Sequence, residues 1–228
     1  MKNLLLLLCF CFPSFLLAQS NTKLEILGGL DYSNRLITNS ISLHTHGEGK
    51  ANTHLGINYY QKLKPKLWLK IGIGFASLGY KTKQSTLMFA DVLTTGGTSA
   101  DPLAGKKIEF SYNYHFLEIP FSLHYDFSEK KLKPFVEFGI VPMYYLQTIT
   151  KQKLDGESHT KRNEQESIIN DFQLATKIAF GVSYSFNEKW EMVVQPNFRY
   201  NLNAIADVPV KEHFWSAGLA IGMRMAMK

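Results

Sequence analysis

The sequence predicts an all-β fold, an eight-stranded antiparallel up-and-down transmembrane β-barrel, and three observations lead to this prediction. Apolar and polar residues alternate with a period of two through most of the chain after residue 20, as they do along β-strands. The alternating runs are separated by connections that are short and long in turn. Large apolar residues share one face of each run, while the other face holds small, polar and charged residues.

Residues 1–18 precede these runs and have the composition of a secretory signal peptide. A short basic start is followed by an apolar run that ends in the small residue Ala18. The run is too short for a membrane anchor, the alternative explanation, and Cys9 and Cys11 lie too early in it for a lipoprotein. Cleavage leaves residues 19–228 as one barrel domain without cysteine, which excludes a disulfide framework.

Composition excludes two other classes of protein. The 228 residues contain no later run near the roughly 20 apolar residues that a membrane helix needs, so the chain is not a helical membrane protein. Aromatic residues make up 13% and charged residues 19% of the chain, which is unlike a disordered protein. The net charge of +6 can indicate nucleic acid, but export favours anionic lipid or cell-wall groups as partners instead.

The first four predicted strands span residues 22–36, 51–61, 66–80 and 108–127. Each of them alternates large apolar residues with small or polar ones. Their apolar faces contain Leu24, Ile26, Leu30 and Tyr32; Leu55, Ile57 and Tyr59; Leu67, Leu69, Ile71, Ile73 and Phe75; and Leu117, Ile119, Phe121, Leu123 and Tyr125.

The last four predicted strands span residues 134–150, 168–186, 189–203 and 212–227. Because a closed barrel has no free edge for proline, Pro120, Pro142 and Pro196 are each expected at a bulge or an interrupted ladder. The apolar faces contain Val136, Phe138, Ile140 and Tyr144; Phe172, Leu174, Ile178, Phe180, Val182 and Tyr184; Trp190, Met192, Val194, Phe198 and Tyr200; and Trp215, Leu219, Ile221 and Met223.

The connections set the predicted orientation. The short ones are expected to be periplasmic turns and the long ones to lie outside the cell, which leaves both termini in the periplasm. The short connections lie near residues 62–65, 128–133 and 187–188, and the long ones at 37–50, 81–107, 151–167 and 204–211.

The polarity of the two faces favours a membrane barrel over a soluble sandwich or a lipocalin-like barrel. The minor face is too small and polar for a soluble core, but it suits the lumen of a barrel whose apolar face meets lipid. Aromatic residues at both ends of the apolar face predict two girdles, with Tyr125, Phe127, Tyr184, Phe186 and Trp190 near the turns and Tyr32, Tyr144, Phe172, Tyr200 and Trp215 near the loops.

The candidate site is a set of charged residues on the lumen face. Because a lone buried charge is prohibitively costly, these groups are expected to pair or to be hydrated, as a structural plug. A proton or solute path is the alternative, but eight strands leave little open bore. The predicted network contains Glu118, His124, Asp126, Glu137, Lys177, Glu191, Arg199 and Arg224, with Glu25, Asp31 and Lys70 on the same face.

No other pattern predicts a catalytic, cofactor or metal site. His44, His46 and His54 lack a convincing set of acidic or cysteine co-ligands, which favours a surface loop over a metal site. His213 and Ser216 are three residues apart and therefore on opposite faces of a strand, which does not suit a nucleophile and its base.

Three segments resemble a known family, the outer-membrane β-barrel proteins common in Bacteroidota, which includes PorT-like proteins. They are the signal end Leu17-Ala18-Gln19, the segment Phe116-Leu117-Glu118-Ile119-Pro120-Phe121, and Phe135-Val136-Glu137-Phe138-Gly139 after a basic turn. The resemblance implies an outer-membrane barrel without a common enzymatic activity, and some PorT-like members are associated with protein secretion. The C-terminal residues 225–228 depart from outer-membrane strands, which usually end on an aromatic residue.

We therefore expect a non-enzymatic outer-membrane protein, without cofactor, that has a structural or partner-binding role in the envelope. The alternatives are a component of a secretion or transport machine, a lipid-modifying enzyme and a narrow channel. The expected partners are outer-membrane lipid and envelope or secretion proteins, the latter through loops 37–50, 81–107 and 151–167.

Overall fold

The computed structural model describes residues 22–38, 47–86, 105–163 and 169–227, and every regular element in these ranges is a β-strand. None of the described residues forms a helix that is long and apolar enough to cross a membrane. The strands are β1 (Thr22–Thr38), β2 (Gly47–Lys64), β3 (Leu67–Thr82), β4 (Ser85–Thr86), β5 (Lys107–Glu118), β6 (Phe121–Asp126), β7 (Leu132–Leu154), β8 (Glu157–Asn163), β9 (Phe172–Ser185), β10 (Trp190–Asn201) and β11 (Lys211–Met227).

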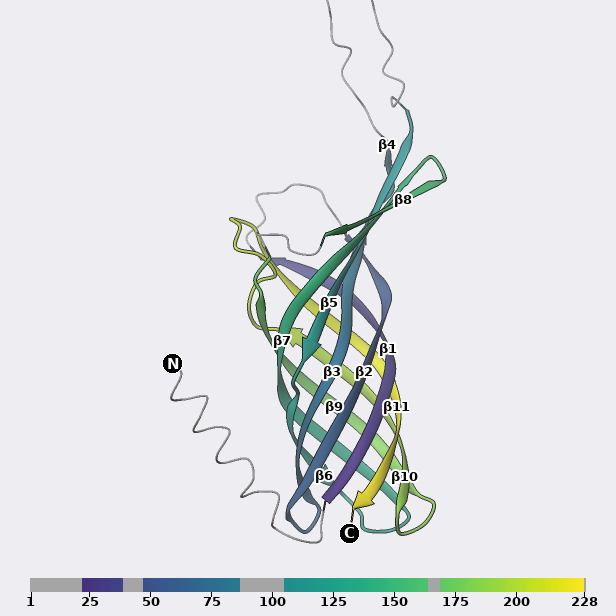
Figure 1. Ribbon diagram of the computed structural model, residues 1–228, viewed down its shortest axis with the longest axis vertical. Helices are drawn as coiled ribbons and strands as arrows, with labels where there is room; N and C mark the ends of the chain where they lie inside the picture. The colour runs from purple at the N-terminus through teal and green to yellow at the C-terminus, as the bar shows by residue number, and fades with distance from the viewer. Residues whose placement is uncertain (1–21, 39–46, 87–104, 164–168, 228) are drawn as a thin grey trace, which may run out of the picture.

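The strands close into an antiparallel ring, as Figure 1 shows. β1 pairs with both β2 and β11, and the ring continues through β10, β9 and β7. β5 and β6 together fill one position between β7 and β3, and β3 pairs with β2 to complete the circle. The ring therefore has eight positions, which confirms the predicted fold class.

The period of two separates an exposed apolar outside from a buried polar inside. On β6, Phe121, Leu123 and Tyr125 are exposed, whereas the alternate residues Ser122 and His124 are buried. Polar side chains also line the inside of the other strands, where buried aromatic and aliphatic side chains join them, and large apolar side chains cover the outside. Because this arrangement is the reverse of a soluble protein, the outer surface requires lipid around it.

The prolines lie where ladder bonds are missing, as predicted. Pro120 divides the predicted strand 108–127 into β5 and β6, and the N–H of Ile119 donates to the carbonyl of Pro142 on the facing strand at 2.9 Å. Pro196 lies in a gap of the β9–β10 ladder but keeps its register with Leu219 on β11. The ring therefore tolerates proline at paired interruptions and not at a free edge.

Three predicted loops are wrong in their bounds because strands extend far beyond the membrane. The predicted loop 151–167 contains the end of β7 and all of β8, joined by a tight turn at Asp155 and Gly156, both with positive φ. The predicted loops 37–50 and 81–107 contain parts of β1 to β5 at their ends. The 23 residues of β7 exceed the roughly 9–11 that span a bilayer. Beyond the membrane neither face of a strand has to be apolar. The alternation of apolar and polar residues therefore disappears from the sequence, although the backbone pairing of the strands continues.

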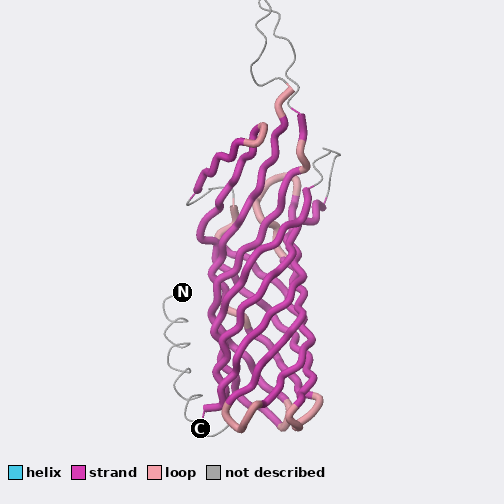
Figure 2. Tube along the Cα trace, turned by 90° about the vertical axis from the view of Figure 1, so that its right-hand side faces the viewer, coloured by secondary structure: helices cyan, strands magenta, loops and turns pink. Residues whose placement is uncertain are grey.

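The extended strands form a sheet that stands above the rim of the ring (Figures 1 and 2). We call it the loop-end sheet, and it consists of residues 47–50, 77–86, 107–115, 147–154 and 157–163. The opposite end has only tight turns, and Thr22 pairs there with Met227, so both ends of the described barrel lie on the turn side. The predicted signal peptide, residues 1–18, lies outside the described residues.

Candidate functional site

The lower lumen, toward the turns, is built around Glu25. Its carboxylate accepts hydrogen bonds from Arg224 Nη2 at 2.8 Å and from the Tyr60 hydroxyl at 3.0 Å. Lys70 Nζ lies 3.1 Å from the same carboxylate, and Asn58 Nδ2 donates to it at 3.0 Å. The carboxylate is fully buried and therefore compensated by two cations and two neutral donors from three different strands.

Glu137 is the second centre of the lower lumen. Lys70 and Lys177 donate to its two carboxylate oxygens, each at 3.0 Å, so Lys70 joins Glu137 to Glu25. His124 lies beside Glu137, and its Nε2 is 3.0 Å from Asp126 Oδ1. Asp126 also accepts from the Trp68 indole at 2.9 Å.

Glu191 is the third centre and lies closest to the turns. Lys133 Nζ and Lys23 Nζ donate to it at 2.6 Å and 2.9 Å, and Arg224 Nη1 lies 3.4 Å from its other oxygen. Arg224 therefore joins Glu191 to Glu25, and the three acidic centres form one continuous network with their cations.

The upper lumen contains one ion pair and one histidine–carboxylate hydrogen bond. Arg199 Nη1 donates to Glu118 Oε2 at 2.7 Å, and His54 Nδ1 lies 2.8 Å from Asp31 Oδ2. Asn197 Nδ2 donates to the other oxygen of Asp31 at 3.4 Å. The sequence favoured a surface loop over a metal site for His54 together with His44 and His46. His54 is a buried lumen residue that bonds to a carboxylate.

An apolar cluster closes the loop end of the lumen above these pairs. Its buried side chains come from β3, β5, β7, β9, β11 and the segment before β11, and aromatic rings contact one another within it. The described lumen is therefore filled by charged pairs below and by apolar packing above. The cluster contains Leu78, Tyr80, Tyr114, Phe116, Val141, Met143, Tyr145, Ala175, Ile205 and Phe214.

All eight charged residues predicted for the network are buried and face the lumen, but they do not form a single group. His124, Asp126, Glu137, Lys177, Glu191 and Arg224 lie in the lower lumen, whereas Arg199 and Glu118 pair with each other farther up. The prediction omitted Lys23, in the predicted strand 22–36, and Lys133, which lies at the end of the predicted turn 128–133. Both share the parity of the inward positions on their strands, and that signal identifies them.

Ser122 with His124, and Ser216 with His213, do not form a nucleophile–base bond, and the described residues do not assemble a metal site. Ser77 Oγ and His115 Nδ1 do lie 2.8 Å apart, at the loop end of the barrel. Ser122 Oγ has no hydrogen-bond partner, so it makes no nucleophile–base bond with His124 two residues away. His213 Nδ1 is bonded to the carbonyl of Asn201 at 3.1 Å. In the described ranges no group of three or more His, Cys, Asp or Glu side chains converges, and His44 and His46 lie outside these ranges.

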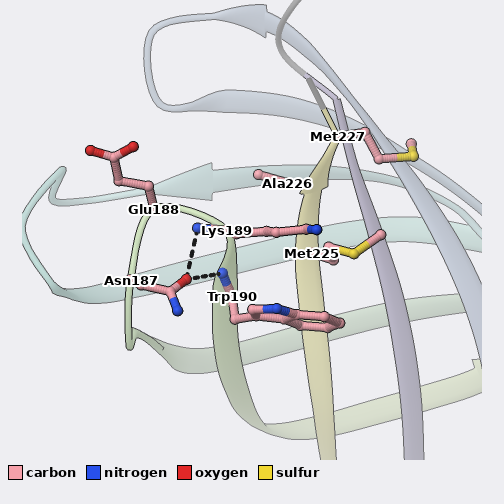
Figure 3. Close-up of a pocket in the computed structure, with 7 residues that line it drawn as sticks. All are labelled: Asn187, Glu188, Lys189, Trp190, Met225, Ala226 and Met227. Atoms are coloured by element: carbon pink, nitrogen blue, oxygen red, sulfur yellow. Dashed lines mark hydrogen bonds between the residues drawn. The ribbon is translucent and has the colours of Figure 1, made fainter.

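A shallow pocket of about 840 Å³ lies at the turn end, between the β9–β10 turn and the end of β11 (Figure 3). Asn187 Oδ1 shapes its turn by accepting from the N–H groups of Lys189 and Trp190, at 2.9 Å and 2.8 Å. Met225 and Met227 line the other side. The lining contains no nucleophile with a base, and it is far along the barrel from the loop-end sheet.

Comparison with known proteins gives a family but no characterised relative. The sequence model of a family described as "Outer membrane protein beta-barrel domain" matches residues 17–208. No curated protein matches the chain.

Several solved structures are similar over most of their length. Neisserial surface protein A has 15% identity and a TM-score of 0.47, with 91% of this chain and 98% of that chain covered. The outer membrane protease OmpT from Escherichia coli has 9% identity and a TM-score of 0.46, with coverage of 92% and 98%. OprG from Pseudomonas aeruginosa has 12% identity and a TM-score of 0.44, with coverage of 92% and 97%.

Proposed function

Because the chain belongs to the outer membrane protein beta-barrel domain family, we propose that it is a non-enzymatic anchor that presents its loop-end sheet to partners. The family membership places it in the outer membrane. The observation that supports the anchor role is the filled lumen, with ion pairs such as Glu137–Lys70 below and the apolar cluster above. In the described part of the barrel these side chains occupy the lumen, which favours an anchor over a channel.

The orientation in this proposal follows from the connections. The tight turns and both ends of the described barrel lie on one side, which in outer-membrane barrels is the periplasmic side. The signal peptide of residues 1–18 delivers the chain to the periplasm, and both termini remain there. The loop-end sheet then projects outside the cell.

Site-specific photo-crosslinking in living cells tests where partners bind. A photoreactive residue at Thr160, exposed on β8, is compared with one at Glu188, exposed in the β9–β10 turn. We expect reproducible adducts from Thr160 and none from Glu188. Adducts from Glu188 alone would overturn the proposal.

Two further measurements address the competing functions. Purified protein in planar bilayers is expected to show no discrete conductance, and lipid A mass spectra are expected to stay unchanged when the gene is deleted. Discrete conductance would show that the barrel is a channel. A change in the acyl chains of lipid A on deletion would show that the protein is an enzyme. A stoichiometric secretion protein among the Thr160 adducts would instead favour the secretion role that the resemblance to PorT-like proteins implies.

A further inference from the structure

Lys50 is an unusual lysine because it is held by neutral groups. Its Nζ donates to Ser111 Oγ at 2.8 Å and to Asn113 Oδ1 at 2.6 Å. It forms no ion pair with a carboxylate among the described residues, although it is half-buried. Lysines inside the barrel differ in this respect, since Lys70 and Lys177 each contact a carboxylate.

Two further lysines lie beside Lys50 on the same face of the loop-end sheet. Lys81 on β3 and Lys151 on β7 are the direct cross-strand partners of Ser111 on β5, so all three side chains project from one face. The nearest acid in the register is Glu48, which is the cross-strand partner of Lys81, is exposed and forms no ion pair with it in the described part of the chain. Glu109, two residues from Ser111 on β5, shares this face as the cross-strand partner of Lys153. The face therefore presents three lysines around a hydroxyl group, with no carboxylate in an ion pair with them in the described part of the chain.

The electrostatics of Lys50 favour an anion as its partner. Partial burial, followed by the positive charges of Lys81 and Lys151, lowers the pKa of Lys50 to about 8. An anion between the three ammonium groups would relieve both effects.

The lysine face is the outer face of the sheet, directly above the lipid-covered surface. Its odd-numbered β5 residues continue to His115, which stacks on the lipid-exposed ring of Phe75 with centroids 5.4 Å apart. The opposite face contains Tyr80, which belongs to the apolar cluster inside the lumen. An anion bound by the lysines would therefore lie beside the barrel and not within it.

The height of the lysines above the membrane matches a phosphorylated headgroup. Lys81 follows the exposed Phe75 by six residues on β3, and Lys151 follows the exposed Leu146 by five on β7. At about 3.3 Å per residue and a strand tilt of about 40°, both lie roughly 12–15 Å above the last lipid-facing side chain. Lysine side chains reach several ångströms back toward the membrane, and an outer-leaflet glycolipid extends its phosphorylated sugars to that level.

We propose that Lys50, Lys81, Lys151 and the Ser111 hydroxyl bind a phosphate group of an outer-leaflet glycolipid and so hold the loop-end sheet against the membrane. The inference rests on the proposed role of this sheet as a binding surface. Ammonium groups attract phosphate as point charges, and the hydroxyl adds a directed donor. The position of these groups on the outer face, above the lipid-facing side chains, favours a glycolipid phosphate as the partner.

Glycolipid binding to the detergent-solubilised full chain tests the inference. The probes are a bisphosphorylated lipid A, the same lipid after phosphatase treatment, and inorganic phosphate in solution. We expect the K50Q/K81Q/K151Q variant to lose at least about tenfold in affinity for the phosphorylated lipid, since each lysine near an anionic surface contributes. The matched control is K64Q/K130Q/K131Q, which removes the same charge from the exposed turns and is expected to stay within about twofold of the unchanged protein.

Several outcomes would overturn the inference. They are equal binding of the dephosphorylated lipid, an equal loss in both triple variants, or inorganic phosphate alone binding as tightly as the lipid. Heat-modifiable migration on gels shows that each variant is folded, so a failed binding assay is interpretable. Thr160 adducts with a protein, without glycolipid binding, would leave the proposed function standing and reject this inference. Glycolipid binding with adducts from Glu188 alone would support this inference and reject the proposed function.

Discussion

The lysines of the lumen differ from those of the loop-end sheet in whether they contact a carboxylate. Lys70 and Lys177 share the carboxylate of Glu137 at 3.0 Å, deep inside the barrel. Lys50 and Lys151 lie on the outer face of the sheet, and among the described residues neither has a carboxylate partner. A buried charge must be compensated within the chain, because its burial otherwise costs too much, whereas a charge near water can remain available for a partner. The contrast separates groups that maintain the barrel from groups available to bind.

The largest effect is expected from removing a lumen acid. Glu137→Ala leaves Lys70 and Lys177 buried without their shared carboxylate and should destabilise the barrel by about 3–5 kcal/mol. Urea unfolding in detergent micelles, followed by heat-modifiable migration, measures the change. The control Glu188→Ala, on an exposed turn, should change stability by less than about 0.5 kcal/mol. A loss below about 1 kcal/mol for Glu137→Ala would break the comparison.

A smaller effect is expected from the Arg199–Glu118 pair of the upper lumen. Either Arg199→Met or Glu118→Met should destabilise by about 3 kcal/mol, because each leaves the partner charge buried. The double variant should recover part of that loss, giving a coupling of roughly 1–3 kcal/mol. The same unfolding assay completes the cycle, and strict additivity would show that the two charges do not depend on each other.

Changing the pH should alter the glycolipid affinity of the loop-end lysines and leave the assembly of the barrel unchanged. The pKa of Lys50 is lowered to about 8, so Lys50 is charged below that pH and loses its charge above it. Its neighbours Lys81, Lys151 and Glu48 face the same site, with Ser111 and Asn113 as neutral groups. Glycolipid affinity should therefore fall a few-fold between pH 7 and pH 9.5.

The K50Q variant sharpens that test. Removing the group whose pKa lies in this range should flatten the pH profile, while the affinity at pH 9.5 should match the unchanged protein. A profile that keeps its slope in K50Q would assign the titration to another group.

The smallest effect on stability is expected from the largest structural change. Replacing residues 151–160 by an Asn-Gly turn joins Thr150 to Lys161, which are already cross-strand partners. Because the removed hairpin makes no contact with the lumen network, the barrel should lose less than about 1 kcal/mol. Thermal unfolding measures this, and a loss comparable to that of Glu137→Ala would show that the sheet and the ring fold as one unit.

The fold was predictable wherever lipid imposes two different faces. Alternation such as Phe121–Ser122–Leu123–His124 survives only where one side meets lipid and the other the lumen, so the eight membrane-spanning segments were found. The same reasoning placed Pro120 and Pro142 at interruptions, and the facing bond between Ile119 and Pro142 confirms it. It failed for residues 151–163, where both faces of the strand meet water.

The lumen charges were predictable as a set but not as pairs. Parity shows that Glu118 and Arg199 face inward, yet they lie 81 positions apart in the chain and meet only through ring closure and register. Lys133 was missed because it was assigned to a turn, and Lys23 was not included although its parity places it on the inner face.

The sequence by itself determined that the chain forms an eight-stranded ring with an apolar outside, because periodicity is a local property that each segment displays separately. Tertiary structure alone decided which charges neutralise one another and which remain free. Lys50 and Lys151 are 101 residues apart (151 − 50) and resemble many other surface lysines in the sequence. Only strand register places them around one hydroxyl group, and electrostatic energy depends on distance in space and not on distance along the chain.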